Sequence, residues 1–173
     1  MNKWNTKKLV SLSLFLAIGV IFNYVENVLI NVPIMPGIKL GLANTIGLLV
    51  LYYYGWKEYL ILGILRITLT ALITGFGMST TIAFGGWLLS SLIVLILYFT
   101  NRFSIFGLSM TSAVFHGLGQ IFVVSLWYQT LGMFVLFPIL GISGLISGLL
   151  IAFLSRLVIK QLPLHLVGGA LHE

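Results

Sequence analysis

The sequence contains no cysteine and no aspartate, and charged residues make up only 7% of its 173 positions. Without cysteine the chain has no disulfide, no thiolate nucleophile and no cysteine-ligated zinc site. Its three carboxylates are Glu26, Glu58 and Glu173. Water-soluble domains carry about 25% charged residues. The scarcity of charge therefore points to lipid as the solvent for most of this chain.

Apolar residues are abundant instead, at 60% of the sequence, and they occur in long runs. Backbone polar groups in a bilayer must be satisfied internally, so only helices and closed barrels span it. Barrel strands alternate apolar and polar residues over about ten positions, whereas residues 88–99 and 139–154 are almost continuously apolar. We therefore expect an all-α integral membrane protein, a bundle of about six transmembrane helices in a single domain over residues 1–173.

Polar turns divide the apolar runs. A short turn is expected at 55–58 and a break at 75–77, where glycines occur, and the last helix is expected to break near Pro138. The first run continues to about residue 30, which predicts a retained span rather than a cleaved signal peptide. The expected helices cover residues 9–30, 39–54, 59–74, 81–100, 106–128 and 133–160.

The basic residues predict the orientation of the bundle. With about six spans, the two termini and the turns near residues 55 and 101 share one side of the membrane. That side holds Lys3, Lys7, Lys8, Lys57, Arg102, Arg156 and Lys160, and the other side holds only Lys39. Cytoplasmic loops carry the excess of Lys and Arg, so both termini should be cytoplasmic, in a bacterial cytoplasmic membrane. The net charge of +6 is explained by this asymmetry, and we expect no nucleic-acid partner.

Arg66 is the most informative polar residue, because it falls near the middle of an expected span. A buried arginine in a membrane is costly, so it should face the bundle interior and have a partner. Thr70 and Thr74 follow at four-residue steps on the same helix face. Two interpretations stay open: Arg66 binds a ligand, or it is a structural residue paired with Glu26 or with backbone carbonyls.

Other polar residues are expected at a similar depth, in the outer half of the membrane. The candidate substrate-binding residues are Glu26, Lys39, Asn44, Arg66, Thr70, His116 and Gln120. Glu26 could bind a cationic group of a ligand or only neutralise Arg66 or Lys39. Three others also have structural alternatives: Lys39 as an exposed side chain at the interface, Asn44 as an interhelical hydrogen-bonding residue, and His116 as a hydrogen-bonding neighbour of another helix. His116 has no second histidine at metal-ligand spacing, so no metal site is expected. The balance of Arg66 and Lys39 against Glu26 favours an anionic or zwitterionic ligand.

Ser13 and Ala17 form a small-residue pair on the first helix. At 100° per residue, Ala17 and Glu26 fall on opposite sides of that helix. One face is therefore polar, and the other lets a partner helix approach closely. Internal packing is the alternative.

The segment from Pro36 to Asn44 reads Pro-Gly-Ile-Lys-Leu-Gly-Leu-Ala-Asn, with Glu26 before it and Arg66 after it. In these features, and in the glycine-rich segment around His116 and Gln120, the chain resembles the Gx transporter family. Members of that family are often labelled heptaprenyl diphosphate synthase component I, and they look like the substrate-binding S components of energy-coupling factor (ECF) vitamin transporters.

The resemblance implies a six-helix domain that binds its substrate from outside. It also implies docking, through the first helix, onto a transmembrane coupling subunit and two ATPase subunits. The helix-one motif of S components usually reads Ala-x-x-x-Ala, and Ser13 replaces the first alanine here.

The synthase label does not fit an enzyme in this chain, because prenyl diphosphate synthases hold Mg²⁺ with aspartate-rich motifs and this chain has no aspartate. It also lacks a phosphate-binding loop for ATP. We expect a non-enzymatic importer subunit with no cofactor, for a vitamin-like or isoprenoid- or quinone-related compound. The alternatives are a self-sufficient secondary transporter and an accessory membrane subunit of isoprenoid or quinone metabolism.

Overall fold

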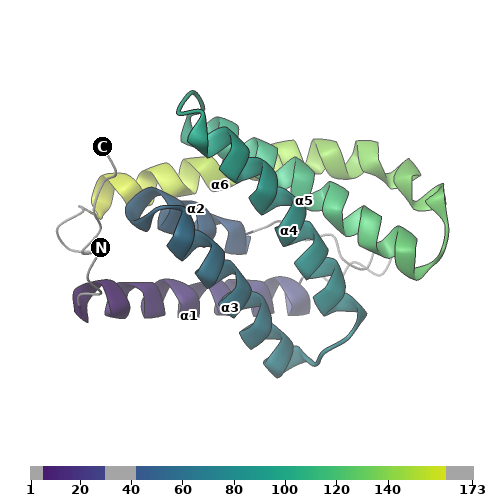
Figure 1. Cartoon of the computed structure of the whole chain (residues 1–173), viewed down its shortest axis with the longest axis horizontal. Helices are drawn as coiled ribbons and strands as arrows, with labels where there is room; N and C mark the ends of the chain where they lie inside the picture. Colours follow the sequence, from purple (N-terminus) through teal and green to yellow (C-terminus); the bar gives the residue numbers. More distant parts are fainter. Residues whose placement is uncertain (1–5, 30–41, 163–173) are drawn as a thin grey trace.

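A computed structural model of the chain describes residues 6–29 and 42–162, and their regular structure is entirely helical (Figure 1). The elements in chain order are α1 (Thr6–Leu29), α2 (Leu42–Tyr54), α3 (Trp56–Thr74), α4 (Met78–Phe99), α5 (Ile105–Trp127), the 3₁₀ helix η1 (Leu131–Leu136) and α6 (Phe137–Gln161). The expectation of an all-α membrane protein is confirmed at this level.

Four segments of the described chain are long and apolar enough to cross a membrane: Thr6–Glu26, Met78–Phe99, Ile105–Trp127 and Leu131–Gln161. The other two helices differ for separate reasons. Only 13 residues of α2 are described. Helix α3 has 19 residues, but Lys57, Glu58 and Arg66 place three charges on it.

One expected boundary, the turn at 55–58, is wrong, and the break expected near Pro138 is confirmed. Only Gly55 separates α2 from α3, because the expected turn residues Trp56, Lys57 and Glu58 already belong to α3. Gly55 has φ +90°, a conformation that glycine adopts without steric cost. Near Pro138 the break takes a specific form: η1 ends at Leu136, and the proline lies in the first turn of α6, where its missing N–H costs nothing.

The bundle has large apolar side chains on its outside, and many polar side chains are buried beside its hydrophobic core. Large exposed side chains repeat along helix faces, as at Leu88, Leu92 and Ile96 of α4. The buried polar residues include Asn23, Glu26, Thr45, Arg66, Thr70, Ser90, Ser91, Ser109, Ser112, Gln120, Ser125, Ser147 and Ser155. A soluble bundle has the opposite distribution, so lipid is the solvent that fits this surface.

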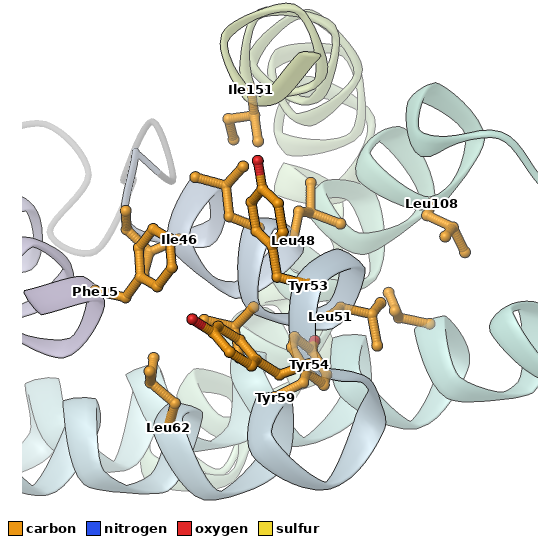
Figure 2. Close-up of a cluster of buried hydrophobic side chains, with 13 residues drawn as sticks. Phe15, Ile46, Leu48, Leu51, Tyr53, Tyr54, Tyr59, Leu62, Leu108 and Ile151 are labelled. Carbon is orange, nitrogen blue, oxygen red and sulfur yellow. The ribbon is translucent and has the colours of Figure 1, made fainter. Parts of the chain in front are cut away.

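Helix α2 is buried on most of its surface because neighbouring helices surround it. It packs against α1, α3, α5 and α6. Around it lies a cluster of buried aliphatic and aromatic side chains, in which Tyr53 points toward α6 (Figure 2). The Tyr53 hydroxyl donates a hydrogen bond of 2.7 Å to the carbonyl oxygen of Leu162, just beyond α6.

The start of α1, the α2–α3 junction and the end of α6 lie at one end of the bundle (Figure 1). Lys8 of α1 forms an ion pair with Glu58 at the start of α3. The Trp56 ring contacts Phe99 at the end of α4, and the Arg156 guanidinium lies over the Phe106 ring at the start of α5. We call this the basic end; its described cations are Lys7, Lys8, Lys57, Arg102, Arg156 and Lys160. The structure thus gathers six of the seven cations on which the predicted orientation depends, and Lys3 lies outside the described residues.

Glycines hold α4, α5 and α6 close together. A Cβ atom on Gly119 of α5 would lie 2.5 Å from the carbonyl oxygen of Gly85 in α4. A Cβ atom on Gly148 of α6 would lie 2.7 Å from the Cα atom of Met110 in α5. Small residues at helix interfaces let backbones approach in this way. The two contacts explain why α5 packs so extensively on both of its neighbours.

Candidate functional site

Arg66 lies in the middle of α3 and is 5% exposed. Its Nη1 atom donates to the carbonyl oxygen of Ala43, and its Nη2 atom lies 3.5 Å from Oδ1 of Asn44. A Cβ atom on Gly19 of α1 would lie only 3.2 Å from the Arg66 Cδ atom. The side chain therefore occupies the place where α1, α2 and α3 meet, and glycine at position 19 leaves room for it.

Polar groups of α1 and α3 lie beside Arg66. Nδ2 of Asn23 donates to Oγ1 of Thr70 at 3.2 Å, and that hydroxyl donates to the Arg66 carbonyl oxygen at 2.8 Å. Glu26 is also buried, three residues after Asn23 on the same face of α1. Its carboxylate has a favourable electrostatic interaction with the Arg66 guanidinium. The buried cation thus has both hydrogen-bond partners and an opposite charge nearby, as a charge inside a membrane requires.

A small cavity borders Arg66, with space for about one water molecule. Four helices, α2 to α5, contribute to its wall. The lining residues are Asn44, Gly47, Leu48, Tyr59, Leu62, Gly63, Arg66, Trp87, Ser90 and Ser112. None of these residues is a carboxylate, so among the described residues of the wall the one formal charge is the positive charge of Arg66.

Two nitrogen donors on this wall lack a hydrogen-bond partner among the described residues. They are Nε of Arg66 and Nε1 of Trp87. Both atoms donate hydrogen bonds and neither accepts them. An unpaired buried donor costs about 1–3 kcal/mol. The cavity therefore favours a guest with acceptor oxygens.

His116 and Gln120 lie together, but not on this cavity wall. Their side chains contact Gly86 of α4, where an added Cβ atom would lie 2.9 Å from atoms of both. Ser112, one turn before His116 on α5, does line the cavity. The two residues therefore continue the polar face of α5 beyond the cavity.

The structure brings together Glu26, Asn44, Arg66 and Thr70 from the expected substrate-binding set. Lys39 and the part of the 36–44 segment before residue 42 lie outside the described residues. Trp87, Gly63 and Ser112 are cavity residues that sequence reasoning missed. An apolar run hides Trp87, and the only available signal was the glycine pair at 85–86 just before it.

Ser13 and Ala17 are exposed on α1, whereas Phe15 and Gly19 are buried. Large apolar side chains surround the pair on the same surface, including Val10, Leu14 and Ile21. Docking through this face stays a prediction. Within residues 6–29 and 42–162, no cluster of three or more metal-ligating side chains occurs.

Comparison with known proteins gives one family. The sequence model of the family described as heptaprenyl diphosphate synthase component I matches residues 15–158, which is most of the chain. No protein of curated function and no solved structure matches the chain.

Proposed function

The chain belongs to the heptaprenyl diphosphate synthase component I family, and we propose that it is the substrate-binding membrane subunit (S component) of an ECF-type, ATP-driven importer. Its substrate is a small, anionic, vitamin-like or isoprenoid- or quinone-related compound. The observation that carries this proposal is the position of Arg66, which is buried among three helices and lines a cavity whose described wall residues include no carboxylate. The chain itself is not an enzyme under this proposal.

Electrostatics supports an anionic substrate. A guanidinium presents five N–H donors in a planar fork, which suits a carboxylate or a phosphate. In Arg66, the Nη1 and Nη2 atoms donate to Ala43 and Asn44 of α2. The Nε atom has no acceptor in the described chain. The Ala43 carbonyl and the Asn44 side chain accept from the guanidinium and hold it in place.

A partner supplies the energy in this proposal, because the sequence has no phosphate-binding loop for ATP. The exposed Ser13 and Ala17 on α1 support docking of a transmembrane coupling subunit there. The cytoplasmic side is then the basic end, in agreement with the excess of cations.

The docking test is purification of the tagged protein from its own cells in mild detergent. The wild type should retain a coupling subunit and two ATPases. Ala17→Trp should lose them, because an indole prevents close helix approach. Leu92→Trp is the matched control: it puts the same ring on the exposed face of α4 and should keep all partners. Retention by Ala17→Trp, or a wild type that moves substrate with no ATPase present, would favour a secondary transporter.

The binding test measures the small molecule that co-purifies, by mass spectrometry after extraction. Arg66→Ala should lose most of it, since a charge-assisted hydrogen bond is worth about 1.5–3 kcal/mol, or roughly ten- to a hundredfold in affinity. Arg66→Lys should restore little, because lysine lacks the fork. Full occupancy in a correctly inserted Arg66→Ala protein would make the arginine purely structural.

A further inference from the structure

Trp87 of α4 is buried in the bundle, at 6% exposure, and it lines the same cavity as Arg66. Its Nε1–H has no acceptor among the described residues. The indole nitrogen of a buried tryptophan ordinarily finds one. The ring of Phe84, whose centroid lies 5.7 Å from that of Trp87, offers packing but no hydrogen-bond acceptor oxygen. The indole is therefore packed in place without a polar anchor.

Gly63 of α3 makes this position possible. A Cβ atom at Gly63 would lie 2.2 Å from the Trp87 Nε1 atom, so any larger residue would displace the indole. Gly63 precedes Arg66 by three residues and shares its helix face. The indole N–H is thereby brought against the α3 surface from which the guanidinium also extends.

These observations indicate what the cavity binds. Arg66 Nε and Trp87 Nε1 are both unpartnered donors of residues that line the cavity, and the described lining residues include no carboxylate. We infer that Trp87 is a second ligand-binding residue, whose Nε1–H and the Arg66 guanidinium together bind oxygens of one acidic group, a carboxylate or a phosphate. The inference rests on the proposed function and specifies the substrate group that this site recognises.

The small size of the cavity determines how a ligand can enter it. It has space for about one water molecule, whereas sites for small ligands usually measure about 300–1,000 Å³. The acidic group enters only when a wall residue moves. Trp87 is the wall residue with a large ring and no hydrogen bond to break, so its indole moves off Gly63 and then donates to the ligand.

The test uses ¹⁵N-labelled protein in lipid nanodiscs and follows the indole N–H resonances. Trp87→Phe identifies the Trp87 signal. Sodium acetate and sodium phosphate are the probes, with sodium chloride at equal ionic strength as the reference. The Trp87 N–H resonance should shift downfield with acetate, with phosphate or with both. The Trp56 and Trp127 resonances should not shift. Arg66→Ala should abolish the shift. A shift with acetate alone identifies a carboxylate site, and a shift with phosphate alone a phosphate site.

Two variants complete the test. Trp87→Phe keeps an aromatic ring but removes the N–H together with the five-membered part of the indole. The probe concentration that half-maximally raises the melting midpoint should rise by about ten- to a hundredfold, the value of a hydrogen bond to a charged group. Trp127→Phe removes an exposed N–H that donates to Thr81 and should leave that concentration unchanged.

A Trp87 signal that moves with neither probe, or a Trp87→Phe protein with unchanged probe affinity, overturns the inference. These outcomes can be distinguished from a failure of the proposed function. Anion binding at Trp87 without co-purifying ATPases overturns the importer alone, and ATPases without anion binding overturn the inference alone.

Discussion

Replacing Gly119 by alanine tests whether backbone contact between α4 and α5 holds the bundle together. The new Cβ atom would lie 2.5 Å from the Gly85 carbonyl oxygen and 2.9 Å from the Gly86 Cα atom. Real Cβ contacts essentially never fall below 3.0 Å, so the helices must separate by at least 0.5 Å, the difference between 3.0 and 2.5 Å. Neither neighbour is a side chain that can rotate away. Overpacking of this kind costs about 1–3 kcal/mol.

Gly141→Ala in α6 is the matched control, because an added Cβ atom there meets nothing within 4 Å. Both substitutions gain the same helix propensity, about 1 kcal/mol, so the difference between them isolates the clash. We expect Gly119→Ala to have a free energy of unfolding about 1–3 kcal/mol below that of Gly141→Ala, measured by reversible unfolding in mixed micelles of increasing dodecyl sulfate content. Two variants that agree within about 0.5 kcal/mol, the usual scatter of a neutral substitution, would refute the close packing of α4 on α5.

Three further outcomes are expected. A cysteine at Phe76, in the turn after α3, should react with an impermeant thiol reagent added to intact cells. One at Thr100, near the basic end, should react only after lysis. The reverse pattern would show that the basic end faces outward, against the predicted orientation. Lys8→Met or Glu58→Met alone should lower the midpoint of unfolding, because each leaves a buried charge without its ion-pair partner, and the double variant should recover most of the loss. Tyr53→Phe should cost about 0.5–1.5 kcal/mol, the value of one neutral hydrogen bond, here to the Leu162 carbonyl; an unchanged unfolding curve would show that this bond contributes nothing.

Hydrophobic runs and glycine breaks were sufficient to predict the helices. Their expected starts and ends fall within a few residues of α1, α3, α4, α5 and α6. The error at residues 56–58 has a physical cause: a single glycine with positive φ reverses the chain direction, so polar residues that looked like a loop continue into the first turn of α3. The sequence pattern shows which residues are polar, but it does not show how few of them form the turn between two helices.

The site was also predictable only in part from the sequence. A charge in an apolar run is visible at once, so Arg66 was identified, and Thr70 followed from helical spacing. The partners of Arg66 on α2 depend on how the helices cross, and that crossing depends on contacts such as Gly19 against the arginine side chain. Trp87 was missed because an aromatic residue in an apolar helix usually faces lipid or core. Only the three-dimensional structure shows that its nitrogen lacks an acceptor.

The two sequence interpretations of Arg66, ligand binding and structural pairing, are compatible once its atoms are considered separately. The Nη1 and Nη2 atoms point toward α2, where Ala43 and Asn44 accept, which establishes a structural role. The Nε atom has no such partner in the described chain, and Arg66 is one of the residues that line the cavity. Bonds that fix a guanidinium also reduce the entropy that it loses when it binds a ligand. The contacts to α2 would therefore position the arginine for the proposed substrate, and a variant that weakens them, such as Asn44→Leu, should reduce binding while Arg66 itself is intact.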